Sequence, residues 1–127
     1  METNDKIAQR VLKKVCEYFE QPIEQVTSNK RNQKYLVPRQ IAMKLIRENT
    51  TLALADIGAY FKGSSKITGG RDHATVLHAI RKVDELKDWD YGSRTILGHL
   101  EVLRRKVQGE KTKQWPIQVR RYKYDYR

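Results

Sequence analysis

The sequence feature that most constrains the fold runs from Gly69 to Ile80 and reads Gly-Gly-Arg-Asp-His-Ala-Thr-Val-Leu-His-Ala-Ile. Two glycines open it, and glycine tolerates the positive φ angles of a tight turn. Asp72 follows and can accept hydrogen bonds from the N–H groups of a first helical turn. Val76, Ile80 and Val83 then recur at helical spacing. The stretch therefore predicts a turn followed by an amphipathic helix.

Polar side chains gather at the N-terminal end of this helix, namely Arg71, Asp72, His73 and Thr75. In a helix-turn-helix protein, that end of the second helix meets the DNA bases. A short helix predicted from Leu52 to Phe61 supplies the first member of such a pair. Gly58 lies in its interior, where glycine costs about 1 kcal/mol relative to alanine. A close approach by the neighbouring helix would justify it.

Two further helices are predicted near the N-terminus. An apolar stripe places the first over residues 5–19, with Thr3 or Asn4 as its cap. Pro22 suits the first position of a short helix that ends at Val26.

The remaining predicted elements are also helical. Pro38 suits the start of a helix whose polar residues face outside: Arg39, Gln40, Lys44 and Arg47. Ser93 caps a last helix with an apolar stripe from Ile96 to Val107. The fold class is therefore all-α, with a helix-turn-helix domain over residues 1–87, an additional helix over 88–108 and a basic aromatic tail over 109–127.

The net charge of +11 is concentrated in two segments. Residues 29–47 hold six basic and no acidic side chains, and residues 110–127 hold six basic and two acidic ones. Such clustering indicates a surface that binds a polyanion, although a solvated basic surface is the plain alternative. Within the first segment, Ser28–Lys34 reads as a basic loop. Beside a duplex it can contact phosphates and send one arginine into the minor groove; otherwise it is a mobile loop without specific contacts.

Two motifs together resemble a known family. The Gly69–Ala79 stretch is similar to the signature of the C-terminal DNA-binding domain of the bacterial replication initiator DnaA, and Val37–Leu45 is similar to the segment upstream of that family's helix-turn-helix. The resemblance covers roughly residues 5 to 87. It implies a small helical domain with an extended, Trp-repressor-like helix-turn-helix.

The resemblance also implies DNA contacts. Arg31 would read the minor groove of an A/T-rich box, and Asp72, His73, Ala74 and Thr75 would face bases in the major groove. Ala74 stands where the family has threonine or serine, so a hydroxyl hydrogen bond is lost while a methyl contact with thymine stays feasible. Box specificity is therefore expected to be relaxed or shifted.

Phosphate contacts are implied by the family at Lys30, Gln40, Arg47 and His78. The position and charge of further residues add Lys34, Arg39, Lys44, Lys62, Lys66 and Arg71 as candidates. Two arginine-rich loop positions of the family are Asn29 and Gln33 here, which weakens the electrostatic contribution. The Lys62–Thr68 segment is an insert of about seven residues relative to the family. It either bulges into solvent or adds phosphate contacts.

An enzymatic function is not indicated. His73 and His78 lie about 140° apart around a helix and cannot share a metal ligand. The sequence lacks a Gly-x-x-x-x-Gly-Lys-Ser/Thr nucleotide loop, and its single cysteine, Cys16, forms no metal cluster. Neither a cofactor nor a metal is expected. No apolar run approaches the ~18 residues of a membrane helix, so a cytoplasmic, nucleoid location is expected.

Three functions remain open. The leading one is a double-stranded DNA binder at DnaA-box-like sites, without ATPase activity of its own, in replication control or transcription. The second is a protein-interaction module that titrates initiator or replisome components. The third is a binder of single strands or RNA through the tail, where Trp115 and three tyrosines alternate with basic residues. That tail can equally pack its aromatic rings on the domain, and a monomer is favoured.

Overall fold

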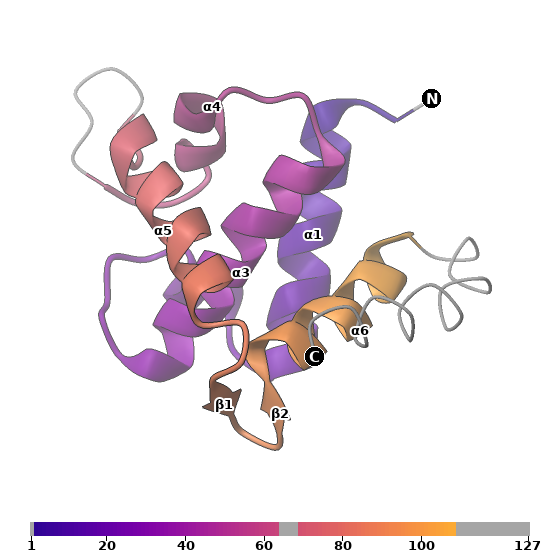
Figure 1. Ribbon diagram of the computed structural model, residues 1–127. Helices are drawn as coiled ribbons and strands as arrows, with labels where there is room; N and C mark the ends of the chain where they lie inside the picture. The colour runs from indigo at the N-terminus through magenta and orange to yellow at the C-terminus, as the bar shows by residue number, and fades with distance from the viewer. Residues whose placement is uncertain (1, 64–68, 109–127) are drawn as a thin grey trace.

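The computed structural model describes residues 2–63 and 69–108, and its elements are helical apart from one small hairpin (Figure 1). The fold class is all-α, as predicted. In chain order the elements are α1 (Asn4–Phe19), α2 (Ile23–Val26), α3 (Gln33–Asn49), α4 (Leu54–Gly58), α5 (His73–Glu85), β1 (Asp90–Tyr91), β2 (Arg94–Thr95) and α6 (Ile96–Gln108).

Helix α3 forms the centre of the fold. It packs between α1 and α5, and α6 closes the open side of α1 and α3 (Figure 1). The core consists of apolar side chains that are almost fully buried, including Val11 and Val15 of α1, Ile41 and Leu45 of α3, Val76 and Val83 of α5, and Leu100 and Leu103 of α6. Burial of this apolar surface is the main favourable contribution to folding. One core therefore supports both the helix-turn-helix and the last helix.

The first helix matches its prediction closely. Thr3 is the N-cap, and its side-chain oxygen accepts a hydrogen bond of 3.2 Å from the backbone N–H of Lys6. The helix ends at Glu20, which adopts a left-handed conformation with φ of 56°. The backbone N–H of Gln21 then bonds to the carbonyl of Cys16 at 3.0 Å, a pattern typical of helix C-termini.

The prediction for α3 was wrong at its start. The helix begins at Gln33, so Pro38 lies in its second turn and the loop before α3 ends at Asn32. A proline inside a helix removes one hydrogen bond and crowds the preceding turn. Here the ring of Pro38 is fully buried, and the added turn places Leu36 beside α5. Tertiary packing thus extends the helix upstream of a residue that locally favours a helix start.

The prediction for the start of α6 was also wrong. Residues 90–95 form a two-stranded antiparallel hairpin that turns at Gly92, whose φ is +65°. The N-terminal turn of α6 is capped by Thr95, whose hydroxyl oxygen accepts a 3.0 Å hydrogen bond from the backbone N–H of Gly98. Ser93 lies in the hairpin turn instead. The sequence offered two hydroxyl residues close together, and hairpin pairing decides which one caps the helix.

Gly58 is required by a close backbone approach. A Cβ atom on Gly58 would lie 1.9 Å from the carbonyl oxygen of Arg71, and the N–H of Arg71 donates a 2.9 Å hydrogen bond to the carbonyl of Gly58. The closest group is thus the backbone that enters α5, and Val76 of α5 itself follows, with Cγ2 3.1 Å from the added Cβ, so the neighbouring helix does approach as expected. This contact fixes the end of α4 against the start of α5.

The residues on the two sides of segment 64–68 lie next to each other. Lys62 and Gly70 form an antiparallel β-bridge. Gly69, with φ of +72°, makes the turn toward this bridge. The chain on the two sides of residues 64–68 is therefore joined by this bridge, and the contact between Gly58 and Arg71, outside the insert, sets the α4–α5 geometry. Lys66 and the rest of 64–68 lie outside the described residues.

We predict that Gly58→Ala destabilises the fold. Overpacking typically costs about 1–3 kcal/mol, which outweighs the ~1 kcal/mol that alanine gains over glycine in a helix. The measurement is urea unfolding followed by circular dichroism. Gly98→Ala in α6 is the matched control, because its Cβ would be in ordinary contact, 3.4 Å from Thr95 Oγ1, and its stability should be unchanged or higher. Equal stabilities of the two variants would contradict the close-contact explanation.

Candidate nucleic-acid interface

The N-terminal turn of α5 presents four exposed side chains in succession: Asp72, His73, Ala74 and Thr75. Asp72 is the N-cap, and its Oδ1 accepts a 2.9 Å hydrogen bond from the backbone N–H of Thr75. Hydrogen bonds from the hydroxyl and the backbone N–H of Thr75 lower the pKa of Asp72. The carboxylate is therefore ionised and held in one orientation at the helix start, while the next side chains point outward.

The loop between α2 and α3 lies against this end of α5. Arg71 Nη2 donates to the carbonyl of Ser28 at 3.5 Å, and the N–H of Lys62 donates to the carbonyl of Thr27 at 2.7 Å. Between the loop and α5 lies a polar groove lined by Asn29, Lys62, Gly63, Arg71, Asp72 and Thr75. Two segments that are more than 30 residues apart in sequence therefore share one face.

Three arginines in this region influence one another. The charge of Arg31 contributes, after burial, to lowering the pKa of Arg71. Burial and then the charge of Arg71 lower the pKa of Arg39 to about 10. None of the three takes part in an ion pair described within residues 2–63 and 69–108. Such a row of like charges attracts an anion, because an anion relieves their repulsion.

Arg39 does not face outside as predicted. It is 2 % exposed, and its guanidinium donates to the carbonyls of Val26, at 2.7 Å, and Gln25, at 3.4 Å. These carbonyls end the short helix α2, and that of Gln25 also accepts hydrogen bonds from the N–H and the hydroxyl of Ser28. Arg39 therefore holds α2, and with it the start of the basic loop, and the prediction that it contacts phosphate directly was wrong.

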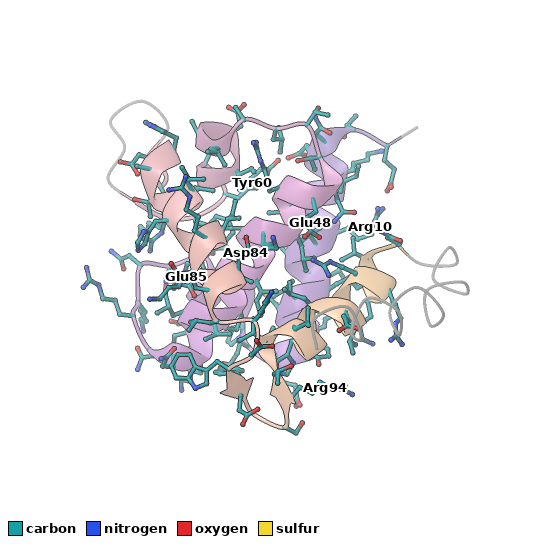
Figure 2. All side chains as sticks on the ribbon, viewed as in Figure 1. Arg10, Glu48, Tyr60, Asp84, Glu85 and Arg94 are labelled. Atoms are coloured by element: carbon teal, nitrogen blue, oxygen red, sulfur yellow. The ribbon has the colours of Figure 1, made fainter. Side chains whose placement is uncertain are left out.

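The side chain of Lys44 likewise forms ion pairs within the protein. Its Nζ lies 2.8 Å from Asp84 Oδ1 of α5 and 3.6 Å from Glu48 Oε2 of α3. Arg104 of α6 holds the same Glu48 through two hydrogen bonds of 2.7 and 3.0 Å. Figure 2 labels Asp84 on α5 and Glu48 on α3. Lys44 thus links three helices, and its assignment as a phosphate contact is corrected on that ground.

The other predicted contact residues are placed as follows. Exposed side chains are Lys30, Arg31, Lys34, Arg47, Lys62 and His78. Gln40 and Arg71 are half-buried, and Lys66 lies outside the described residues. Arg47 also donates to the carbonyl of Leu52 at 3.3 Å, which holds it at the C-terminal end of α3, before α4. The structure brings five candidates to one face, namely Arg31, Lys62, Arg71, Asp72 and Thr75, whereas Arg47 lies at the other end of α3 from the basic loop.

Sequence reasoning overlooked two contributors to the groove. The sequence analysis interpreted Asn29 only as the loss of a positive charge relative to the family, and Gly63 only as part of the insert. Both line the groove beside Arg71. The amide of Asn29 can donate a hydrogen bond to an anion, and the only sequence signal for it was its place between Ser28 and the basic residues.

Within residues 2–63 and 69–108, no three histidine, cysteine or acidic side chains lie close enough to hold a metal ion. In the same part of the chain no helix is both long and apolar enough to cross a membrane.

Comparison with known protein families finds a match for this sequence. Residues 8–83 fit the model of the bacterial dnaA protein helix-turn-helix. The chain belongs to this family. The match spans α1 to α5 and contains the whole candidate interface, whereas α6 lies beyond the matched residues.

Individual DnaA relatives agree with the family match. The chain is 42% identical over 94 residues to chromosomal replication initiator protein DnaA from Thermus thermophilus. The aligned region covers 74% of this chain and 19% of the relative. It is 36% identical over 100 residues to the same initiator from a Ruegeria species, covering 79% of this chain and 19% of the relative. The chain thus matches about a fifth of the length of these DnaA proteins.

A solved structure has the same fold. It is described as a DNA replication initiation factor, and the match has a TM-score of 0.63 at 32% sequence identity. The match covers 82% of this chain and 28% of that chain. The fold assigned from sequence is therefore also found by comparison of structures.

We predict that Arg39→Met lowers the free energy of unfolding by about 1–3 kcal/mol, because the carbonyl of Val26 loses its buried side-chain donor. It should leave the salt dependence of DNA binding unchanged, because Arg39 touches no phosphate. Urea unfolding and binding titrations at several salt concentrations measure the two effects. If Arg39→Met leaves stability unchanged and reduces the salt dependence of DNA binding, Arg39 contacts phosphate after all.

Proposed function

We propose that the chain binds double-stranded DNA in a sequence-specific manner at DnaA-box-like sites, in the control of replication initiation or in transcription. The observation that carries this proposal is the joining of the basic loop to the N-terminal turn of α5 through Arg71, which gives one face two separate means of contacting a duplex. Family membership supports the same assignment. The relatives are named as chromosomal replication initiators.

The N-terminal turn of α5 supplies the major-groove contacts in this proposal. Its exposed side chains stand at the end of a helix whose other face is buried through Val76 and Val83. The carboxylate of Asp72 can accept from a cytosine amino group, and the methyl of Ala74 can touch thymine. The fixed cap at Asp72 limits the entropy lost when these contacts form.

The basic loop supplies the minor-groove and phosphate contacts. Arg31 is exposed and near Arg71, so an A/T-rich minor groove with its strong negative potential is a suitable site for its guanidinium. The groove beside it, with Asn29, Lys62 and Arg71, has donors suited to a phosphate. In this model the loop sets affinity and register, while α5 sets sequence preference.

We further propose that this activity involves no ATP hydrolysis by the chain itself, and that it acts as a monomer on nucleoid DNA in the cytoplasm. The helix-turn-helix match to DnaA supports a binding role rather than a catalytic one. Contacts with replication proteins would then be separate from the DNA face. A protein-interaction role or single-strand binding becomes the better explanation if duplex binding fails the tests below.

The first test is the salt dependence of duplex binding. Lys30→Ala and Arg47→Ala should each reduce the slope of log K against log salt by about 0.9 and should weaken all sequences alike, because each removes one phosphate contact. Lys13→Ala is the control, since Lys13 is an exposed lysine on α1. Unchanged slopes in both test variants, or an equal loss in the control, would remove the proposed surface from the interface.

The second test is base readout by α5. His73→Ala should cost about 1–3 kcal/mol on the preferred duplex and little on a scrambled one. Ala74→Thr should shift preference toward an A/T-rich box, because it restores a hydroxyl. His78→Ala is the matched control on the same helix, and it should weaken both duplexes equally as a phosphate contact. If His73→Ala behaves like His78→Ala, α5 does not read sequence.

A further inference from the structure

A second groove lies at the opposite end of α5 from the N-terminal turn that carries Asp72 to Thr75, and its lining includes Gln40, a candidate phosphate contact. Its walls are the N-terminal half of α3, the C-terminal turns of α5 and the β1–β2 hairpin. Apolar side chains dominate the lining, among them Leu36, Val37, Leu86, Trp89, Tyr91 and Ile96. We call it the α3–hairpin groove.

Trp89 makes this groove unusual. Its side chain is 55% exposed, more than any other large hydrophobic residue in the described part of the chain. An exposed tryptophan beside an apolar groove typically marks a contact surface, because its large ring gains most when a partner covers it. Its backbone is fixed by a 2.8 Å hydrogen bond from its N–H to the carbonyl of Leu86, so the ring is carried on an ordered turn.

The segment that runs from the end of α5 to β1 beside the groove is acidic on balance, although Lys82 lines the groove together with Asp90. The segment from Lys82 to Asp90 contains four acidic and two basic side chains, although the chain as a whole has a net charge of +11. Glu85, Asp88 and Asp90 are exposed, and none of them takes part in a described ion pair. Figure 2 labels Glu85 near the C-terminal end of α5. The groove therefore favours an occupant that is both aromatic and basic.

The chain carries such a segment. Residues 110–127 follow α6 and combine Trp115, Tyr122, Tyr124 and Tyr126 with six basic and two acidic side chains. No other stretch of the sequence joins aromatic and basic residues at this density.

The stretch between the end of α6 and Trp115 is long enough to reach the α3–hairpin groove. Helix α6 starts at the groove with Ile96 and ends at Gln108, so the return path is about the length of the helix, ~20 Å for 13 residues. The seven residues from Gln108 to Trp115 span roughly 23 Å when extended, and the tyrosines follow with further reach.

We propose that the C-terminal segment 110–127 folds back along α6 and docks its aromatic side chains in the α3–hairpin groove of its own chain, over Trp89, with its basic residues paired to Glu85, Asp88 and Asp90. Docking there leaves the N-terminal turn of α5 open, because the groove touches only the C-terminal turns of that helix. The inference therefore goes beyond the proposed DNA binding and does not depend on it.

Paramagnetic labelling of the full chain tests this directly. A nitroxide is placed on Gln118→Cys in ¹⁵N-labelled protein. Cys16 stays unlabelled because it is 7% exposed and burial raises its pKa to about 11. The label should cause loss of the Trp89 indole signal and of the Leu36 and Leu86 amide signals. The amide signals of Ile7 and Lys14, which lie near the end of α6, should be retained.

Three controls make the result decisive. Glu85→Gln, Asp88→Asn and Asp90→Asn together should restore the lost signals, whereas the matched set Glu17→Gln, Glu24→Gln and Asp56→Asn should not. A mixture of unlabelled ¹⁵N chains with nitroxide-bearing unenriched chains should show no loss. Loss in that mixture would assign the groove to a second copy and overturn the proposal. Loss confined to Ile7 and Lys14, or no loss at all, would overturn it as well.

Discussion

The contact between Gly58 and Arg71 is the constraint on which the candidate interface depends. The two backbones approach so closely that no Cβ fits at Gly58, and a 2.9 Å hydrogen bond joins the Arg71 N–H to the Gly58 carbonyl. This contact sets where α5 begins relative to α4. From the same residue, the Arg71 side chain reaches the carbonyl of Ser28. The α4–α5 turn and the basic loop are thus positioned by one residue.

Charge is distributed unevenly around this contact. On the loop side, burial lowers the pKa of Arg71 and of Arg39, and the neighbouring charges of Arg31 and Arg71, respectively, add to the effect. Between α5 and α6, by contrast, Lys44 and Arg104 are paired with Asp84 and Glu48. Positive charge that is left without an acidic partner on one face is a cost to the free protein that a polyanion can offset.

The parts of the fold that could be predicted from sequence are those set by local signals. The cap at Asp72 and the stripe through Val76 and Val83 fixed α5, and a threonine cap with an apolar stripe fixed α1. The start of α3 could not be predicted, because Pro38 is a strong local sign of a helix start and its burial against other helices overrides that sign. The cap of α6 was missed for a similar reason, since a hairpin turns at Ser93.

The same distinction holds for the site. Exposure of the α5 N-terminal turn follows from which helix face is apolar, so Asp72 to Thr75 were placed correctly on the surface. The burial of Arg39 depends on the carbonyls that end α2, which come from a different segment of the chain. The pairing of Lys44 depends on α5 and α6 together. Neither the burial of Arg39 nor the pairing of Lys44 with α5 can be predicted from the sequence of α3, which carries both residues.

The central claim is that one rigid face reads DNA with two elements at a fixed separation. Binding-site selection from random duplexes tests it most directly when the unmodified protein, Arg31→Ala and His73→Ala are compared. The account predicts one enriched motif with two parts, of which an A/T-rich part is lost in Arg31→Ala and the other in His73→Ala, with unchanged spacing. A motif that both variants weaken throughout, or no enriched motif for the unmodified protein, would contradict it.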